Sequence, residues 1–340
     1  MLDVFNSDAF KVTSLTDAIN RIKFVPGRIG AMGLFTSSGI STTSIAIEEK
    51  DGVLSLVSPT PRGGPGQTLD RNRRTMRNIS VPHFQIDDAV MADSVQGVRA
   101  FGSETELETV LGKVNDQVSV HVQSLAATQE YSRIGAIKGI VTYADGSTLD
   151  LFNFFEVSQV AERDWDLDNA TPAAGVLRQT CAEVYRQIAG ILDGTPFSGV
   201  HAFCGDAFFD DLISHTEVRA SYLQQQEASQ LRTGYIDGGA GGSYGSFNFG
   251  GITWENYRGS VGATSFIDTD HCQLFPTGVP GLFKTYYAPA DYNETVNTIG
   301  KQFYNKMYPM PDDKGMNMQV QTNPLEICMR PRVLLVGRRT

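Results

Sequence analysis

The sequence TNPLEICMRPRVLLVGR, residues 322–338, closes the chain with two short apolar runs on either side of Arg330-Pro331-Arg332. Short apolar runs of this kind are typical of extended structure, so LEICMRPRVLLVG, residues 325–337, is expected to be an extended segment. Neither run approaches the ~20 apolar residues that a membrane-spanning helix needs. The stretch therefore predicts extended structure near the end of the chain, and no membrane association.

The clearest helix signal upstream begins at Ser103, which forms a capping box with Glu106. Apolar residues then recur at helical spacings of three and four, which predicts a helix from Ser103 to about Tyr131. A single apolar stripe on so long a helix indicates that it lies across another part of the chain. The stripe consists of Leu107, Val110, Leu111, Val114, Val118, Val122 and Leu125.

Two further helices are expected in the second half of the chain. One covers residues 172–192, with Thr171 as its cap and Pro172 at its first position. The other covers residues 206–224, with Asp206 as its cap. A short buried strand, residues 197–205, lies between them.

Alternating apolar residues and Asp-Gly pairs predict hairpins. Residues 44–58 would form a hairpin or ribbon with a turn at Asp51-Gly52, and residues 139–155 a hairpin with a turn at Asp145-Gly146. The segment FNFGGITWENYRG, residues 247–259, predicts strands with a bulge at Gly250-Gly251. This mixture of helices and antiparallel strands indicates the α+β class.

No catalytic, cofactor-binding or metal-binding pattern stands out. The segment GSVGATS, residues 259–265, lacks the lysine of a nucleotide-binding loop, and no GxGxxG sequence occurs. His271 and Cys272 are adjacent, and adjacent strand residues point to opposite faces, so they are not expected to share a proton. The four scattered cysteines predict reduced, buried thiols in a chain without a signal peptide.

The stretch TPRGGPGQTLDRNRRTMRN, residues 60–78, is a basic island in a chain of formal net charge −10. A phosphate loop is not expected there because the lysine is missing, and DNA contact is the weaker alternative because the surrounding chain is acidic. Residues 156–168 form an acidic run. This run is either a solvated face or the surface to which the arginines of a neighbouring copy bind. The candidate interface residues are Arg62, Arg71, Arg73, Arg74 and Arg77 on one side and Glu162, Asp164, Asp166 and Asp168 on the other.

Three segments resemble the tailed-phage major capsid protein E family, the lambda-like major head proteins. They are YYAPADYNETVNTIGKQFY (286–304), the closing stretch 322–338, and HAFCGDAFFDDLISHTEVRASY (201–222). The resemblance implies the Hong Kong 97-type capsid fold. Its expected parts are an N-terminal arm (1–45), an extended loop (46–85), a peripheral domain with a spine helix (86–150), an axial domain (151–285), a peripheral ribbon (286–322) and an axial closing strand (323–340).

The resemblance further implies a major capsid protein that assembles through hexamers and pentamers into the icosahedral head of a tailed double-stranded-DNA phage or prophage. Such a protein is a non-enzymatic component of the virion, is assembled in the host cytoplasm and needs no cofactor. Its expected partners are other copies of itself, a scaffold, a portal, decoration or cement proteins, and packaged DNA only non-specifically. Residues 51–112 contain no lysine, which argues against lysine cross-linking from the extended loop. The alternatives are the shell of a bacterial nanocompartment of the same fold and a cytosolic α+β enzyme with an unrecognised site.

Overall fold

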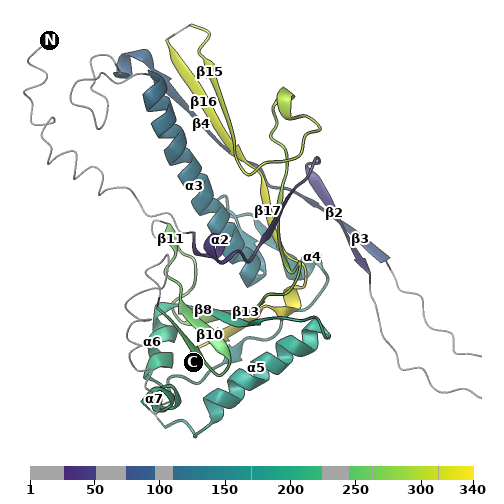
Figure 1. Ribbon diagram of the computed structural model, residues 1–340, viewed down its shortest axis with the longest axis vertical. Coiled ribbons are helices and arrows are strands. Elements are labelled where there is room, and N and C mark those ends of the chain that lie inside the picture. Colours follow the sequence, from purple (N-terminus) through teal and green to yellow (C-terminus); the bar gives the residue numbers. More distant parts are fainter. Residues whose placement is uncertain are drawn as a thin grey trace, which may run out of the picture.

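The computed structural model describes residues 27–50, 74–95, 110–169, 171–223, 245–261, 264–312 and 314–340. Figure 1 shows an elongated molecule, with a long helix beside a narrow sheet at one end and a broader sheet flanked by helices at the other. Helices and mostly antiparallel sheets are mixed, as the predicted α+β class requires. Within the described ranges, no helix combines the length and the apolar character that crossing a bilayer would need.

Helix α3, Val110–Lys138, is the long helix. Its 29 residues span about 44 Å at 1.5 Å per residue. The predicted start at Ser103 lies outside the described residues, and the helix ends seven residues beyond the predicted Tyr131, at Lys138. Its final turns enter the core, where Ile137 is fully buried. The apolar stripe did not predict this extension because the buried turns also carry polar residues.

A three-stranded antiparallel sheet lies along the first half of α3. Its order is β15-β16-β4, with β15 Tyr304–Pro309, β16 Gly315–Thr322 and β4 Phe84–Met91. The short helix η3, Ala92–Val95, follows β4. Residues alternate between the two faces of each strand, so one face meets α3 and the other is open.

A two-stranded ribbon projects from the body (Figure 1). It pairs β2, Ser44–Lys50, with β3, Arg74–Ser80, in antiparallel register from Ser44↔Ser80 to Lys50↔Arg74. The predicted turn at Asp51-Gly52 falls in residues 51–73, outside the described residues. The ribbon thus carries both ends of that segment away from the body.

The middle of the molecule holds a second three-stranded sheet, in the order β1-β14-β17. Strand β1, Thr36–Gly39, runs parallel to β14, Phe283–Tyr287, and β17, Pro324–Cys328, runs antiparallel to β14. The short helix α2, Arg28–Met32, lies against α3. Between β14 and β15 the chain forms a protruding loop with the one-turn helix η4, Asn293–Thr295.

The broad end is a six-stranded sheet in the order β7-β18-β13-β8-β10-β9, flanked by α5, α6 and α7. Phe203, Phe208 and Trp254 are fully buried in this part. A small pair, β11 and β12, lies beside it. The bounds are β7 Arg163–Asp164, β18 Leu335–Arg338, β13 His271–Thr277, β8 Gly199–Cys204, β10 Ile252–Asn256, β9 Ser246–Phe249, β11 Ser260–Val261, β12 Thr264–Ser265, α5 Val176–Leu192, α6 Asp206–Ser214 and α7 Thr216–Leu223.

The closing stretch was expected to be one strand, but it forms two, β17 and β18, because the helical turn η5, Pro331–Val333, divides it. The strands enter different sheets: β17 pairs with β14, whereas β18 lies between β13 and β7. The break at Pro331 therefore passes the chain from the middle sheet to the broad one.

Two predicted helix boundaries are wrong. Helix α5 begins at Val176 rather than at Pro172, because Gly175 adopts the left-handed conformation, with φ of 87°. The predicted helix 206–224 breaks at His215 into α6 and α7. Asp206 is the first helical residue and not the cap, and its side chain accepts hydrogen bonds from Asn256 and Arg258 instead.

The hairpin turn at Asp145-Gly146 is confirmed by β5, Ile140–Thr142, pairing with β6, Thr148–Asp150. The second arm stops early because Asp150 caps a short helix, α4 Leu151–Phe154, by accepting from two backbone N–H groups. Gly250-Gly251 forms a tight turn between β9 and β10 rather than a bulge. Both glycines have positive φ, 63° and 81°, as a primed hairpin turn requires.

Candidate functional site

The arginine segment emerges from the end of the β2–β3 ribbon. Arg62, Arg71 and Arg73 lie outside the described residues, and Arg74 is the first residue of β3. Arg77, further along β3, has its Nη1 2.9 Å from Oε1 of Glu156. This hydrogen bond and the arginine's charge lower the pKa of Glu156. One arginine of the segment is therefore paired with an acid of the same chain and helps to fasten the ribbon to the body.

The acidic run contains the two-residue strand β7 and turns beyond it, where Asp166 has a φ of 49°. Trp165 and Leu167 are buried, whereas the four predicted acids Glu162, Asp164, Asp166 and Asp168 are exposed. The structure thus leaves all four acids accessible in and beside β7.

Three of the four acids have partners within the chain. Glu162 lies 3.0 Å from His271 Nε2, and Asp164 lies 3.3 Å from Arg338 Nη2. Asp166 accepts a hydrogen bond from the side chain of Asn169. Because exposed carboxylates keep free lone pairs, these contacts leave room for another donor.

The His271-Cys272 pair separates as predicted. His271 faces Glu162 at the surface, whereas Cys272 is fully buried opposite Cys204 in the neighbouring strand. Burial and then the neighbouring Cys204 raise the pKa of the Cys272 thiol well above its usual value, which disfavours the reactive thiolate. All four cysteines of the chain are free and buried.

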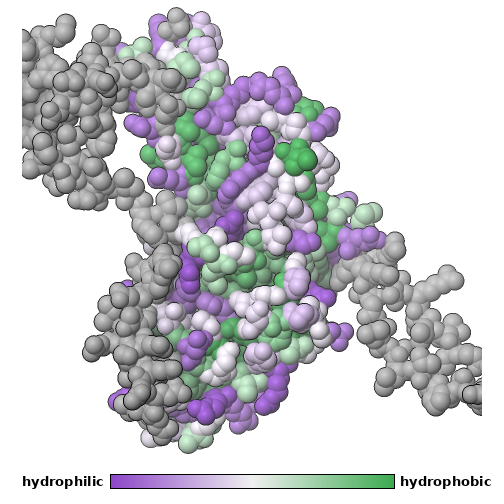
Figure 2. All heavy atoms as spheres, in the orientation of Figure 1, coloured by the Kyte–Doolittle hydropathy of each residue, from purple (hydrophilic) through white to green (hydrophobic). Residues whose placement is uncertain are grey.

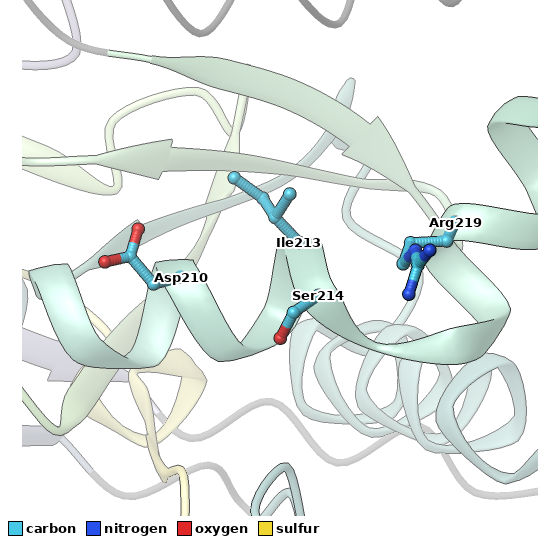
Figure 3. A pocket seen from close by; sticks show the side chains of 4 residues that line it. All are labelled: Asp210, Ile213, Ser214 and Arg219. Atoms are coloured by element: carbon cyan, nitrogen blue, oxygen red, sulfur yellow. The ribbon is translucent and has the colours of Figure 1, made fainter.

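Two surface hollows lie on the broad end. One, of about 450 Å³, is lined by Asp210, Ile213, Ser214 and Arg219, and Figure 3 shows these side chains spread along α6 and α7 rather than converging on one point. The other, of about 350 Å³, has mainly apolar walls, including Leu274 and Leu335. Neither hollow brings a nucleophile and a base together. No group of three potential metal ligands occurs in the part of the chain that the structure describes.

A buried polar junction, for which the sequence holds no local signal, attaches residues 28–30 to the body. Oε1 of Glu130, on α3, accepts the N–H of Ile29 at 2.6 Å, and Oε2 accepts that of Gly30 at 3.3 Å. Arg28 donates to both carboxylate oxygens of Glu255, at 2.6 and 3.0 Å. The other side of Glu255 meets His201 Nε2 at 3.0 Å.

Burial and charge act in opposite directions on these two carboxylates. Burial raises the pKa of Glu130, although the N–H groups of Ile29 and Gly30 and the charge of Arg133 oppose the rise. Burial opposes ionisation of Glu255 too, but hydrogen bonds from His201 and Arg28 outweigh it and lower its pKa. The junction thus stabilises a charged Glu255 next to Arg28.

A third carboxylate, Glu326 of β17, completes the junction. It is almost fully buried, accepts from Gln129 Nε2 at 3.1 Å, and lies 3.9 Å from Arg133 Nε. Burial raises its pKa to about 7. Arg133 also lies 3.9 Å from Glu130, so one arginine serves two buried carboxylates. This arrangement is suited to holding segments of the chain together rather than to acting on a substrate.

Comparison with known proteins gives one consistent result. Residues 11–338 match the family described as phage major capsid protein E. The chain is 28% identical over 348 residues to the major capsid protein of Pseudomonas phage KPP10, covering 97% of each chain. It is 26% identical over 368 residues to that of Salmonella phage Felix O1, covering 98% of each.

A solved structure gives the same picture of the fold. The putative capsid protein of a prophage of E. coli CFT073 superposes with a TM-score of 0.57 and 15% identity, covering 98% of this chain and 97% of that one. The predicted Hong Kong 97-type capsid fold is therefore confirmed. The elongated α3 end, the projecting ribbon and the broad sheet are parts of this fold.

Proposed function

The chain belongs to the phage major capsid protein E family, and from this premise we infer that it forms the protein shell of a phage or prophage head. The match over residues 11–338 carries the inference, because it spans both ends of the molecule rather than a single motif. Shell formation needs extended surfaces that meet other copies. The elongated outline and the projecting ribbon in Figure 1 suit that requirement.

The proposed assembly proceeds through hexamers and pentamers into the icosahedral head of a tailed double-stranded-DNA phage. Closed rings of one chain need heterologous contacts, in which one surface meets a different surface of the next copy. In the proposed division, residues 1–45 are the arm, 46–85 the extended loop, 86–150 and 286–322 the peripheral domain, and 151–285 with 323–340 the axial domain. The ribbon at residues 44–50 and 74–80 supports the extended loop.

The proposed contact joins the arginine segment of one copy to an acidic surface of the next. Arginine forms bidentate bonds with carboxylates and remains charged at any physiological pH. The exposure of the four acids in and beside β7 supports their part in this contact. The residues are Arg62, Arg71, Arg73, Arg74 and Arg77 on one copy and Glu162, Asp164, Asp166 and Asp168 on its neighbour.

We also propose which partners the protein has and where it is assembled. The protein is a structural, non-enzymatic component of the virion, assembled in the host cytoplasm without a cofactor. It works with a scaffold, a portal and decoration or cement proteins. Packaged DNA contacts it only non-specifically, since a chain of net charge −10 provides few of the clustered cations that phosphate binding needs.

Electron microscopy of the purified, expressed chain tests the proposal. Uniform closed shells are the expected result, first from the chain alone and then after co-expression with the scaffold encoded by the same phage. A chain that stays monomeric under both conditions would contradict shell formation. A gene neighbourhood with portal and terminase genes would favour a phage head over a nanocompartment, in which an enzyme cargo gene is expected instead.

A further inference from the structure

The open face of the β15-β16-β4 sheet carries a polar cluster assembled from three distant segments. Gln85 Nε2 donates to both carboxylate oxygens of Asp87, at 2.7 and 2.8 Å. Gln321 Nε2 donates to Oε1 of Gln85 at 2.6 Å and to Oδ1 of Asp291 at 2.7 Å. Strand register places Gln321 opposite Gln85, on the face away from the buried Val90 and Met318. Two amides therefore connect two carboxylates across this face.

The cluster has an exposed rim and a buried floor. Asp87 and Asp291 are exposed, whereas Gln321, on the central strand, is only 1% exposed. Because Nε2 of Gln321 is fixed by two acceptors, its Oε1 is fixed as well. That oxygen and the hydroxyl of Tyr292 are buried and have no hydrogen-bond partner among the described residues. A buried acceptor without a hydrogen-bond partner costs free energy, so a hydrogen-bond donor at this position would stabilise the cluster.

Acceptors outnumber donors at this site. Both amide donors are already used, while each carboxylate retains free lone pairs and Gln321 Oε1 retains all of its own. Burial, and then the charges of Asp291 and Asp87, raise the pKa of Tyr292 to about 12. A positively charged group would therefore complement this site.

Lys306, a cation beside Tyr292, is already paired with another acid. Lys306, on β15, has its Nζ 3.2 Å from Glu294 and 4.9 Å from the ring of Tyr292. It is thus held at the side of the cluster by its own acid. Counting Asp87, Asp291 and Glu294 against Lys306 leaves an excess of negative charge on this face.

We propose that this cluster is the receiving site for an arginine from residues 62–74 of a neighbouring copy of the chain. A guanidinium offers five N–H donors and a fixed positive charge, which matches two carboxylates and an unpaired amide oxygen. Residues 62–74 supply Arg62, Arg71, Arg73 and Arg74 against one acid, Asp70. The inference rests on the proposed shell function and adds a second acidic surface to the one at β7.

A neighbouring copy is the expected source because of where the segment leaves the body. The ribbon carries Lys50 and Arg74, the residues that flank the segment, to its free end (Figure 1). The face of the molecule drawn in Figure 2 mixes hydrophilic and hydrophobic residues without one dominant apolar area. A repeated contact of modest strength becomes effective when a shell multiplies it.

The first test replaces the two rim acids by their isosteres, Asp87→Asn/Asp291→Asn. Light scattering and electron microscopy then give the concentration at which shells begin to form. We expect about a tenfold rise, with thermal unfolding of the dissociated chain unchanged. The matched control, Asp93→Asn/Asp116→Asn, removes the same charge from exposed positions outside the cluster and should stay near the parent value. Asp291→Asn alone, a change at one exposed residue, covers the case in which the double variant folds poorly.

A second test measures proximity directly. Asp291→Cys combined with Arg73→Cys should give a ladder of cross-linked copies in assembled shells on non-reducing gels, whereas either substitution alone should not. The native cysteines are buried and do not interfere. A cross-link confined to one chain, or no cross-link together with normal assembly of the double Asn variant, would overturn the inference.

Two other outcomes separate the possible failures. Assembly that is lost on chelation with EDTA and restored by Ca²⁺ in the parent, but not in Asp87→Asn/Asp291→Asn, would show a metal ion at the cluster instead of arginine. A parent chain that forms no shells refutes the proposed function together with this inference. Parent shells with a fully competent double Asn variant refute the inference alone.

Discussion

The two ends of the molecule differ in how much apolar core each has of its own. Around the six-stranded sheet, Trp254 is fully buried, with its ring 5.0 Å from that of Trp165 and 6.0 Å from that of Phe208. Beside the first half of α3, a separate cluster has only Val90 and Met318 as buried members within the described structure. One end is thus stabilised mainly from within, whereas the other has little core.

Exposed side chains show the same difference. Met76 on the ribbon is 71% exposed, Val120 on α3 58%, and Ile299 in the loop after β14 70%. Large apolar side chains left in water contribute nothing to folding, and they gain burial only when another chain covers them. We therefore expect the broad end to determine the stability of the isolated chain and the α3 end to depend on neighbouring copies.

The largest expected effect on folding comes from the aromatic core. Trp254→Ala removes a fully buried ring and the indole N–H that donates to the Phe249 carbonyl at 3.2 Å. We expect a loss of about 4 kcal/mol in the free energy of unfolding, measured by denaturant titration of the dissociated chain. Met318→Ala, in the small cluster, should cost about 2 kcal/mol. Equal losses at the two sites would remove the distinction between the ends.

The buried junction should give a smaller, pH-dependent effect. Burial raises the pKa of Glu326 from 4.5 to about 7, so the folded chain binds this proton more tightly than the unfolded chain does. Its contribution is therefore fully present below pH ~4.5 and is lost as the pH rises to ~7. Relative to Glu326→Gln, the parent should lose on the order of 3 kcal/mol across this interval.

Paired unfolding curves of the parent and Glu326→Gln between pH 4.5 and 7.5 measure this loss. The variant serves as the reference because an amide keeps the shape and does not titrate. A difference between the two curves that stays flat with pH would place the titration elsewhere in the junction, with Glu130 as the next carboxylate to replace.

The fold was predictable where the signal is local. Asp145-Gly146 marks a real turn, whereas the closing stretch, expected to be one strand, is divided at Pro331 into two strands of different sheets. The start of α5 was not predictable, because Thr171-Pro172 is an acceptable cap and the left-handed Gly175 overrides it. Local propensity is a weak prior that the surrounding structure can reverse.

The receiving cluster could not be found in the sequence. Asp87, Asp291 and Gln321 are far apart along the chain and carry no shared motif, and Asp87 stands next to Asp88 as an ordinary acidic pair. Adjacent strand residues point to opposite faces, and Asp88 does face His121 on the other side of β4, with 3.4 Å between Asp88 Oδ2 and His121 Nε2. Only the register of β4 with β16 brings Gln85 and Gln321 together.

Replacing the arginines between β2 and β3 should have the smallest effect on folding, and it tests directly whether the α3 end depends on neighbouring copies. Arg71→Ala/Arg73→Ala/Arg74→Ala changes residues of the segment between β2 and β3 and the first residue of β3, and we expect no measurable change in the unfolding free energy of the isolated chain. Shell formation should fail or require a much higher protein concentration, because single exposed ion pairs contribute only ~0–1 kcal/mol and several are removed together. Arg71→Lys/Arg73→Lys/Arg74→Lys keeps the charge but not the fork of donors, so partial recovery would show that bidentate geometry contributes. Normal shells from the alanine variant would mean that the α3 end is completed by contacts other than these arginines, with the exposed Met76 and Ile299 as the next positions to replace.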